Sequence, residues 1–206
     1  MNIAVTGSMG GGKSFVAEKL AELISAEYIS CDLICRKLLE PGQVAHERMR
    51  QEFSADFFMD NGELNRSHLR KAIFTDALLR QKIDDFLHPL VRKDILNKCK
   101  KAEKAGDNLV LEIPLLFEKG WEEDFDMTLV VSADDKTCIK RIVKRDRVSS
   151  EDARKGVACQ MPLFEKCKRA DMVIDNSGSF TATLQKLEEL QQNISTKNLF
   201  IGKRQK

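Results

Sequence analysis

The sequence contains no apolar run that approaches the ~18–20 residues needed to span a membrane as a helix. Its 34 basic and 32 acidic side chains almost cancel, so the formal net charge is only +2. A charge this small implies no strong electrostatic attraction to nucleic acid or to a membrane surface. No signal peptide, internal repeat or low-complexity segment is apparent either. These absences predict a globular cytoplasmic protein with no nucleic-acid partner, no membrane association and no evident obligate protein partner.

Paired cysteines are absent as well. The six cysteines occur singly, none belongs to a C-x-x-C pair, and His46, His68 and His88 add no zinc-binding spacing. Without a secretory signal, such scattered cysteines are expected to be reduced and mostly buried thiols. With 206 residues and 42% hydrophobic side chains, the chain is long enough for one sizeable core, or for one domain that carries insertions.

The beginning of the chain carries the clearest motif. Residues 2–6 form a short apolar run typical of a β-strand, residues 7–14 read G-S-M-G-G-G-K-S, and a helical pattern begins at residue 15. A G-x-x-x-x-G-K-S string between a strand and a helix is typical of a phosphate-binding loop. Glycines let successive backbone N–H groups turn toward an anion, and the positive end of the helix dipole points at the same place. A glycine-rich turn that binds nothing is a weak alternative, because this pattern rarely occurs by chance.

The loop assigns roles to its residues. Lys13 is expected to supply positive charge to the β- and γ-phosphates, and the Ser14 hydroxyl is suited to bind Mg²⁺. The backbone N–H of Phe15 lies in the first helical turn and is expected to reach the α-phosphate. The residues predicted to bind the nucleotide here are Gly7, Gly10, Gly11, Gly12, Lys13, Ser14 and Phe15.

Four more segments have strand character, and helical patterns separate them: residues 28–29, 108–113, 127–131 and 171–174. Near-continuous apolar runs favour a parallel sheet that is covered on both faces. Five strands interleaved with helices therefore predict an α/β fold with a doubly wound, five-stranded parallel sheet. Because such sheets bind ligands at the carboxyl ends of their strands, we expect the phosphate-binding loop, Asp32, residues 114–118 and residues 175–178 along one edge.

Residues 33–100 have helical patterns almost throughout. This segment is too long for a simple crossover between two strands, so we interpret it as an inserted helical subdomain. Asn65 is suited to cap a helix over residues 66–74. A later, long helix contains Pro89, which is expected to kink it or to divide it at His88.

A phosphate-binding loop indicates a nucleoside triphosphate and leaves three classes open: a small-molecule kinase, a GTPase switch, and a mechanochemical or DNA-linked ATPase. A GTPase needs a guanine-reading N-K-x-D motif, but residues 97–100 read N-K-C-K within a helical pattern. An ATPase usually needs an acidic pair at the end of a strand, whereas the third strand ends E-I-P at residues 112–114. A kinase needs an acid near Mg²⁺ and the acceptor hydroxyl, an acceptor pocket and a positively charged lid. The sequence offers candidates for all three, which favours the kinase.

Asp32 is the candidate acid, because it follows the predicted second strand, whose tip should face the γ-phosphate. A carboxylate there can align an attacking hydroxyl, accept its proton and hold Mg²⁺ through water. A strand-end or capping aspartate fits the position equally well. Arg141 and Arg145 lie four residues apart in a basic helical segment, residues 133–147, and could close over the triphosphate as a lid. A solvated basic face is the more common explanation of that pattern, and Ser149 marks the start of the next helix.

His88 and residues 115–117 are candidates for the acceptor pocket. A histidine before a proline in helical surroundings is by default a contact in the core, although it could also touch an anionic acceptor. Leu115, Leu116 and Phe117 are more typical of plain core than of a pocket wall. Pattern alone decides neither case.

Several strings stand at characteristic relative positions: G-G-G-K-S at residues 10–14, E-P-G at 40–42, H-P-L-V at 88–91, P-L-L-F-E at 114–118, Q-M-P at 160–162 and D-N-S-G at 175–178. In this order they make the chain similar to dephospho-coenzyme A kinases over nearly its whole length. The resemblance implies ATP-dependent phosphorylation of the ribose 3′-hydroxyl of dephospho-coenzyme A, with ATP and Mg²⁺, giving coenzyme A and ADP in the final step of coenzyme A biosynthesis. A kinase of the same architecture that acts on another nucleotide-like or small hydroxyl acceptor is the alternative.

The resemblance also implies a fold of the P-loop kinase type, with a single kinase domain over residues 1–206. Its parts are a core over residues 1–32, 105–135 and 168–193, a helical coenzyme A-binding insert over residues 33–104, a lid over residues 136–167 and a basic tail over residues 195–206.

Site residues follow from the same resemblance. Asp32 becomes the catalytic base, and Lys13 and Arg141 become the groups that stabilise charge. Arg145 and Asn176 are implied on the ATP side, and Ser14 and Asp32 at the metal. The implied acceptor contacts are His88, Leu115, Leu116 and Glu118.

The chain departs from the family pattern in several places. Residues 30–32 read S-C-D where many members read D-A-D, so Ser30 replaces the first acid. Met9 and Gly11 stand where isoleucine and serine are frequent, and Gly156 stands where an arginine is common. Phe15 replaces a frequent threonine, but the role of its backbone N–H does not depend on the side chain.

Overall fold

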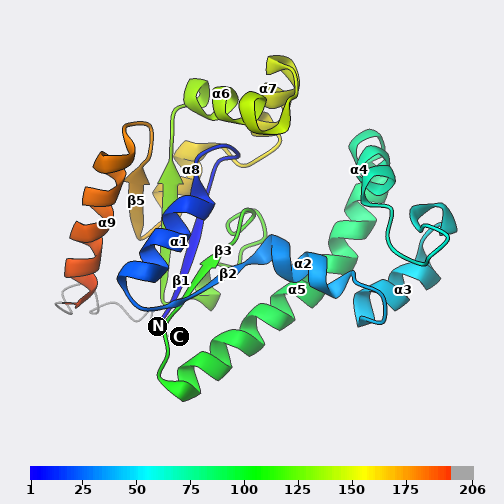
Figure 1. Cartoon of the computed structure of the whole chain (residues 1–206), viewed down its shortest axis with the longest axis horizontal. Helices are drawn as coiled ribbons and strands as arrows, with labels where there is room; N and C mark the ends of the chain where they lie inside the picture. The colour runs from blue at the N-terminus through cyan, green and yellow to red at the C-terminus, as the bar shows by residue number, and fades with distance from the viewer. Residues whose placement is uncertain (196–206) are drawn as a thin grey trace. The chain divides into compact units, whose positions relative to one another are not determined.

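The computed structural model describes residues 1–195, which form two compact units. The first unit combines Met1–Ser30 with the segment that begins at Lys101, and the second unit is Cys31–Lys100 (Figure 1). Within the described residues, no helix has the length and apolar content that crossing a membrane requires. The predicted basic tail, residues 195–206, lies outside the described residues apart from Ser195.

A five-stranded sheet organises the first unit. Its strands are β1 (Asn2–Gly7), β2 (Glu27–Ser30), β3 (Leu109–Glu112), β4 (Met127–Ser132) and β5 (Met172–Asp175). Every strand pair is parallel, and the order is β2-β3-β1-β4-β5. The loop after the central strand β1 therefore emerges between the carboxyl ends of β3 and β4. This arrangement confirms the predicted doubly wound parallel sheet.

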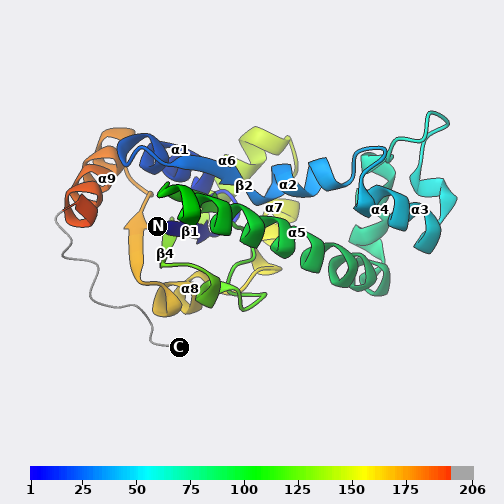
Figure 2. The same ribbon diagram turned by 90° about the horizontal axis from the view of Figure 1, so that it is seen from below.

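Helices cover both faces of this sheet. The helices of this unit include α1 (Lys13–Leu23), α8 (Leu163–Arg169) and α9 (Phe180–Ser195) and the 3₁₀ helix η2 (Glu122–Asp124). Helices α6 (Asp135–Asp146) and α7 (Ser150–Ala158) lie beyond the carboxyl ends of the strands (Figure 1). Figure 2 shows α1 and α9 on one face of the sheet and α8 on the other. Side chains alternate along β1, so Ile3 and Val5 pack with Leu20 of α1 and Leu187 of α9. The intervening residues of β1 face the opposite side.

Helix α8 is the element that sequence patterns fail to predict. It has 7 residues, LFEKCKR, and follows Pro162. So short a stretch makes only about two turns, which is too few for hydrophobic periodicity to distinguish it from a loop. Its position beside β4 depends on tertiary packing.

The second unit is helical. Its elements are α2 (Cys31–Leu38), α3 (Val44–Glu52), η1 (Ala55–Phe57), α4 (Arg66–Thr75) and most of α5 (Ala77–Ala105). Met49, Leu69 and Phe86 belong to its buried core. Asn65 caps α4 as predicted, because its side chain accepts a hydrogen bond from the backbone N–H of His68 at 3.1 Å.

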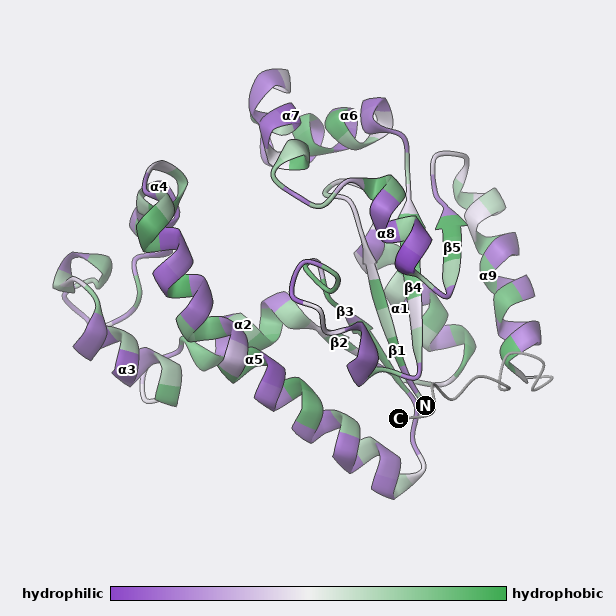
Figure 3. Cartoon of the chain, turned by 180° about the vertical axis from the view of Figure 1, so that it is seen from behind, coloured by the Kyte–Doolittle hydropathy of each residue, from purple (hydrophilic) through white to green (hydrophobic). Residues whose placement is uncertain are grey.

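Helix α5 corrects one expectation. It runs without interruption from Ala77 to Ala105 and contains Pro89, so the predicted division at His88 is wrong. Proline removes a backbone donor at a cost of about 3 kcal/mol, but the helix buries Val91 and Ile95 just beyond it, which offsets that cost. Figure 3 shows how hydrophobic and hydrophilic residues alternate along α5.

The cysteines correct another expectation. All six are thiols outside any disulfide, and only Cys99 and Cys138 are buried, so the prediction of mostly buried thiols is wrong. Cys159 is exposed, and the other three are partly buried.

Candidate active site

The phosphate-binding loop joins β1 to α1 in the first unit. Helix α1 begins at Lys13, earlier than its periodicity predicts, and Gly12 before it adopts a left-handed conformation with φ 91°. The N–H groups of the first turn have no acceptor within the helix, so they can bind an anion. The Lys13 side chain is largely buried, and its Nζ donates to the backbone oxygen of Ser8 at 3.1 Å. The loop thus has the local geometry that its sequence indicates.

Two glycines of the loop are required by close neighbours. A Cβ atom at Gly10 would lie 2.5 Å from the backbone oxygen of Cys138 in α6. A Cβ atom at Gly12 would lie 2.2 Å from the side-chain nitrogen of Asn176. Both separations are far below van der Waals contact. The missing side chains therefore let α6 and the loop after β5 approach the phosphate-binding loop.

Arg141 and Asn176, which come from distant segments, meet at this loop. The Asn176 amide donates to the Gly11 oxygen at 2.8 Å and accepts from the Thr183 hydroxyl at 2.8 Å. The Arg141 guanidinium donates to the Gly11 oxygen at 3.3 Å and to the Asn176 backbone oxygen at 2.9 Å. These bonds place a positive charge beside the loop that is suited to bind phosphate.

Arg145 lies one helical turn further along α6 and has a different partner. Its guanidinium donates to both carboxylate oxygens of Asp146, at 2.7 and 2.8 Å. This bond raises the pKa of Arg145 above its ordinary value, and attraction to Glu112 adds to the rise. Arg145 is therefore within electrostatic reach of the site, while its hydrogen bonds in the described structure go to Asp146.

The connection after α7 also touches the loop, which sequence reasoning missed. Gln160 Oε1 accepts from the backbone N–H of Met9 at 2.7 Å, although the two residues are 151 positions apart. A Cβ atom at Gly156 would lie 3.2 Å from the Met9 sulfur, so Met9 occupies the space where a larger side chain would begin. The Q-M-P string is visible in the sequence, but nothing in it indicates which backbone group a glutamine will bind.

Glu112 is the most informative residue that sequence reasoning missed. It ends β3 and is 8% exposed. Its Oε1 accepts from the Ser14 hydroxyl at 2.9 Å, and its Oε2 accepts from the Tyr28 hydroxyl at 2.7 Å. Burial raises the pKa of Tyr28 above its ordinary value, and the hydrogen bond to Glu112 raises it further. The signal in the sequence is one acid at a strand end, which a search for an acidic pair overlooks.

The Ser14 and Glu112 oxygens are candidate ligands of Mg²⁺. No group of three or more His, Cys, Asp and Glu side chains that could hold a metal ion occurs in the part of the chain that the structure describes. Mg²⁺ is usually bound by one or two carboxylates together with substrate phosphates. The Ser14 hydroxyl and the buried Glu112 carboxylate, 2.9 Å apart, are hard oxygen donors at the phosphate-binding loop. The residues present therefore fit an ion that arrives with the nucleotide.

The P-L-L-F-E segment, residues 114–118, is held by a buried ion pair. Lys166 of α8 is fully buried, and its Nζ lies 2.8 Å from Glu118 Oε1 and 3.3 Å from the backbone oxygen of Pro114. Glu118 Oε1 also accepts from the backbone N–H of Met161 at 3.1 Å. This network fixes the direction of the Glu118 side chain before any ligand binds.

The apolar residues of the same segment differ in exposure. Leu116 and Phe117 are 0% and 2% exposed and belong to the core, as their pattern favours. Leu115 and Glu118 are partly exposed. Of the acceptor contacts predicted here, Leu115 and Glu118 offer surface to a ligand, and Leu116 does not.

The second unit carries Asp32 and His88. Asp32 is exposed in the first turn of α2, where an acidic side chain favours the helix dipole. Its carboxylate adds to the effect of burial in raising the pKa of the Cys35 thiol. His88 lies within α5, and its Nε2 is 3.7 Å from Asp84 Oδ1. The roles of both residues toward a substrate stay predictions.

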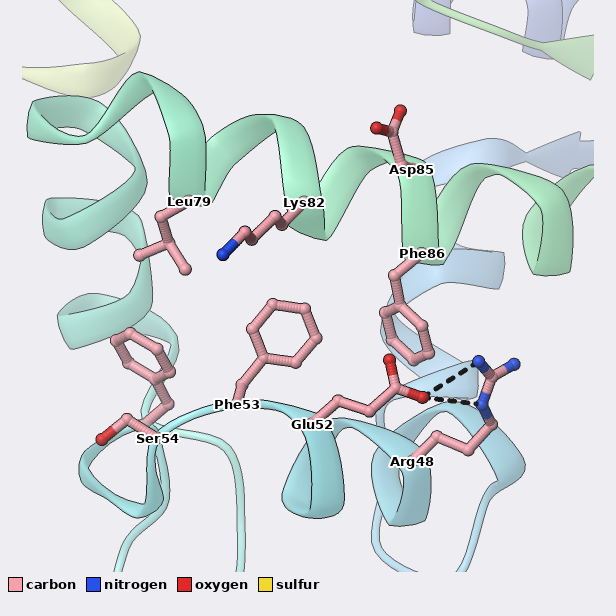
Figure 4. A pocket seen from close by; sticks show the side chains of 9 residues that line it. Arg48, Glu52, Phe53, Ser54, Leu79, Lys82, Asp85 and Phe86 are labelled. Atoms are coloured by element: carbon pink, nitrogen blue, oxygen red, sulfur yellow. Dashed lines mark hydrogen bonds and ion pairs between the residues drawn. The ribbon is translucent and has the colours of Figure 1, made fainter.

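A hollow of about 670 Å³ lies within the second unit, between α3 and the first turns of α5 (Figure 4). The rings of Phe53 and Phe86 stand 5.7 Å apart along it. Arg48 lies over the Phe86 ring at 5.1 Å and donates to Glu52. In Figure 4, Lys82 extends from α5 toward this hollow. The lining of this hollow combines aromatic rings with charged side chains.

Comparison with known proteins decides the family. A profile described as dephospho-CoA kinase matches residues 1–182. The chain belongs to the dephospho-CoA kinase family. A dephospho-CoA kinase from Desulfotalea psychrophila is 38% identical over 183 residues, covering 89% of this chain and 92% of the relative. One from Bacillus cereus is 35% identical over 192 residues, covering 93% and 96%. These matches confirm the resemblance that the sequence strings indicate.

Solved structures agree with this membership. The dephospho-CoA kinase from Campylobacter jejuni has a TM-score of 0.72 at 29% identity, covering 96% of this chain and 98% of that one. Shikimate kinase from Acinetobacter baumannii, at 16% identity and a TM-score of 0.56, covers 96% of this chain and 94% of that one and shares the fold alone. The fold is that of a P-loop kinase, as the sequence predicts.

Proposed function

We propose that this protein transfers the γ-phosphoryl group of ATP to the ribose 3′-hydroxyl of dephospho-coenzyme A, giving coenzyme A and ADP in the cytoplasm. Membership of the dephospho-CoA kinase family, matched over residues 1–182, carries the choice of reaction. The meeting of Arg141 and Asn176 at the phosphate-binding loop supports the donor half of the site. The partly exposed Leu115 and Glu118 support a place for the acceptor.

On the donor side, the N–H groups of the loop and Lys13 hold the triphosphate. Arg141 faces the negative charge that builds on the transferred group. Ser14 and Glu112 would hold Mg²⁺ on the nucleotide, with Asp32 reaching it through water. When bound, the ion neutralises phosphate charge and orients the γ-phosphoryl group.

Two further residues serve the nucleotide. Arg145 reaches the phosphates when its guanidinium leaves Asp146, exchanging one anion for another of higher charge. Asn176 holds the D-N-S-G loop where it can contact the adenine end. A lid over residues 136–167 excludes water, which competes with the acceptor hydroxyl for the phosphoryl group.

On the acceptor side, Asp32 accepts the proton of the 3′-hydroxyl as the new O–P bond forms, and ADP leaves with the electron pair of the broken bond. His88, Leu115 and Glu118 contact the acceptor. The helical insert, residues 33–104, binds the remainder of dephospho-coenzyme A, and the hollow of about 670 Å³ gives it room for an elongated arm. In this proposal the core, the helical insert and the lid belong to a single kinase domain.

The decisive experiment offers the protein several acceptors. In the presence of ATP and Mg²⁺, ADP release is followed with dephospho-coenzyme A, with nucleoside monophosphates and with no acceptor. We expect rapid release with dephospho-coenzyme A alone and a product that phosphorus NMR identifies as a 3′-phosphate. Preference for a nucleoside monophosphate would instead support another nucleotide-like acceptor. Equal release without any acceptor would indicate an ATPase and contradict the proposal.

A further inference from the structure

Tyr28 is the only tyrosine in the chain, and its hydroxyl is directed at the phosphate-binding site. It lies in the edge strand β2, and its Oη donates to Glu112 Oε2 at 2.7 Å. The other oxygen of that carboxylate accepts from Ser14 Oγ at 2.9 Å. Two hydrogen bonds therefore connect the edge of the sheet to the serine of the loop, and all three residues belong to the first unit.

Two hydroxyl groups hold a buried carboxylate here. Glu112 is 8% exposed, so its carboxylate is largely removed from water. A buried carboxylate is costly unless its oxygens accept hydrogen bonds. Ser14 and Tyr28 each supply one, at opposite oxygens. Without the Tyr28 donor, the carboxylate would be free to rotate or to draw water into the site.

The sheet itself does not need the Tyr28 hydroxyl. Backbone pairing sets Tyr28 beside Val110 and Ser30 beside Glu112, and these pairings do not involve side chains. The hydroxyl reaches along the ladder to Glu112, which shares a face with Val110 because residues two apart point the same way. Ser30 is neutral, so no second carboxylate stands in register with Glu112. The backbone pairing of β2 with β3 is therefore complete without the hydrogen bond from Tyr28 to Glu112.

The Ser14 hydroxyl has a single proton, which limits its orientation. In this structure that proton is donated to Glu112 Oε1. The lone pairs of the oxygen then point away from the carboxylate, and they are what a metal ion would use. A carboxylate that is fixed at both oxygens fixes the Ser14 hydroxyl as well.

We propose that Tyr28 is a positioning residue which, through Glu112, keeps the Ser14 oxygen turned toward the divalent cation of a metal–nucleotide complex. This proposal depends only on the donor half of the proposed function, because it requires a bound metal–nucleotide complex and no particular acceptor. Tyr28 itself touches neither nucleotide nor metal in this scheme. Partners of metal-binding groups commonly change metal affinity by ~10–100-fold when they are removed.

The test compares two variants that each remove a hydroxyl-to-carboxylate bond from the same sheet. Tyr28→Phe removes the donor to Glu112 and keeps the ring. Thr128→Val removes the bond from Thr128 Oγ1 to Asp171 Oδ2, also 2.7 Å, and is the matched control. Mn²⁺, which is visible by electron paramagnetic resonance, is titrated into each protein with a non-hydrolysable ATP analogue. The thermal midpoint of each unliganded protein is recorded as well.

We expect Tyr28→Phe to weaken Mn²⁺ binding in the nucleotide complex by about 10-fold, the lower end of that range. Thr128→Val should lower the thermal midpoint and leave Mn²⁺ affinity unchanged. If Tyr28→Phe also lowers only the midpoint, its hydroxyl serves the fold alone and the proposal is overturned. No acceptor is present, so a weakened Mn²⁺ affinity would support the role of Tyr28 even if dephospho-coenzyme A proved to be the wrong acceptor.

The single tyrosine allows a second, direct measurement. Protein labelled with 3-fluorotyrosine gives one fluorine NMR signal, which belongs to Tyr28. We expect this signal to shift when Mg²⁺ is added to the complex with the ATP analogue, and to stop responding to Mg²⁺ in Glu112→Gln. If the signal of the unsubstituted protein does not shift when Mg²⁺ is added, the proposed coupling between Tyr28 and the metal site is contradicted.

Discussion

The two compact units present their candidate acids in opposite settings. In the sheet unit, Glu112 is 8% exposed and accepts hydrogen bonds from two hydroxyl groups. In the helical unit, Asp32 is exposed in the first turn of α2. A buried carboxylate with fixed partners keeps one orientation, whereas an exposed one can exchange water for a substrate hydroxyl. The donor half of the site is thus formed before ligands bind, and the proposed base is left able to react.

The contacts of the two units also differ in sequence distance. Asn176 donates a hydrogen bond to Gly11 across 165 residues, which is possible because the parallel strands β1 and β5, with β4 between them, end at the same edge of the sheet. His88 faces Asp84, one helical turn away in α5. A sheet gathers distant residues at one edge, whereas a helix brings together those that are close in sequence.

The largest effect is expected from Asp32→Asn, which tests the part that the helical unit plays in the reaction. The amide keeps the shape of the side chain but cannot accept the proton, so turnover should fall by ~10²–10⁴. ATP binding, measured by calorimetry, should stay close to that of the unsubstituted protein. Asp56→Asn changes another exposed acid of the same unit and serves as the control. Near-normal turnover in Asp32→Asn would remove Asp32 from the mechanism.

The next largest effect concerns the buried ion pair of the sheet unit. Lys166→Met leaves the Glu118 carboxylate without its cation and should lower the free energy of unfolding by about 3–5 kcal/mol. Adding Glu118→Gln should restore a large part of that loss, because no charge is then left unpaired. The free energy of unfolding of the single and the double variant is measured by denaturant unfolding. An unchanged midpoint in Lys166→Met would show that the pair does not stabilise the P-L-L-F-E segment.

Arg141→Ala tests whether the sheet unit supplies charge to the transition state. Loss of one preorganised donor should lower turnover by ~10²–10³, with a smaller change in the KM for the acceptor. Lys140→Ala removes the neighbouring exposed cation of α6 and should leave turnover unchanged. If Arg141→Ala weakens acceptor binding alone, Arg141 is not a lid charge.

Helix caps provide a smaller effect that reports on each unit separately. Asn65 caps α4 of the helical unit, and Ser149 caps α7 of the sheet unit by accepting from Asp152 N–H at 3.0 Å. Asn65→Ala and Ser149→Ala should each cost about 1 kcal/mol. In calorimetry we expect Asn65→Ala to shift the transition of the helical unit only. A single transition that both variants shift equally would show that the two units unfold together.

The smallest effect is expected at acid pH. The side-chain and backbone hydrogen bonds from Thr137 hold the pKa of Asp134, the cap of α6, below its ordinary value. Because the folded pKa is lowered, its stabilisation is fully present above the ordinary carboxyl pKa of about 4 and is lost as the pH falls through the folded value. Asp134→Asn keeps a capping oxygen without the charge. Its thermal midpoint should therefore lie below that of the unsubstituted protein at about pH 6 and approach it at about pH 3.

The sequence predicts those features that depend on short stretches of chain. The loop over residues 7–14, the five strands and the cap at Asn65 are each encoded within a few neighbouring residues. Of the two outcomes that Pro89 predicts, a kink or a division at His88, the division does not occur, because the local cost of a proline is outweighed by burial at Val91 and Ile95. Local rules fail where packing supplies the larger energy.

The site residues also divide into those that a short stretch of sequence predicts and those that depend on contacts distant in the sequence. Lys13 and Ser14 are evident from the motif, whereas the positions of Asp32 and Arg141 leave alternatives open and their roles come from the family resemblance. Gln160 could not be predicted, because its partner is the backbone of Met9 far away in the sequence. A search for an acidic pair overlooks Glu112, because its partners are hydroxyl groups on two other elements.

The sequence by itself determined that a strand, a glycine turn and a helix form an anion-binding loop, and which family the chain resembles. Only the tertiary structure decided the strand order β2-β3-β1-β4-β5, and with it the position of Glu112 between β1 and β2. The physical reason is that parallel pairing joins segments through backbone groups that every residue carries. Hydrophobic patterns reveal that a strand exists, but its neighbours are selected by the packing of the whole core.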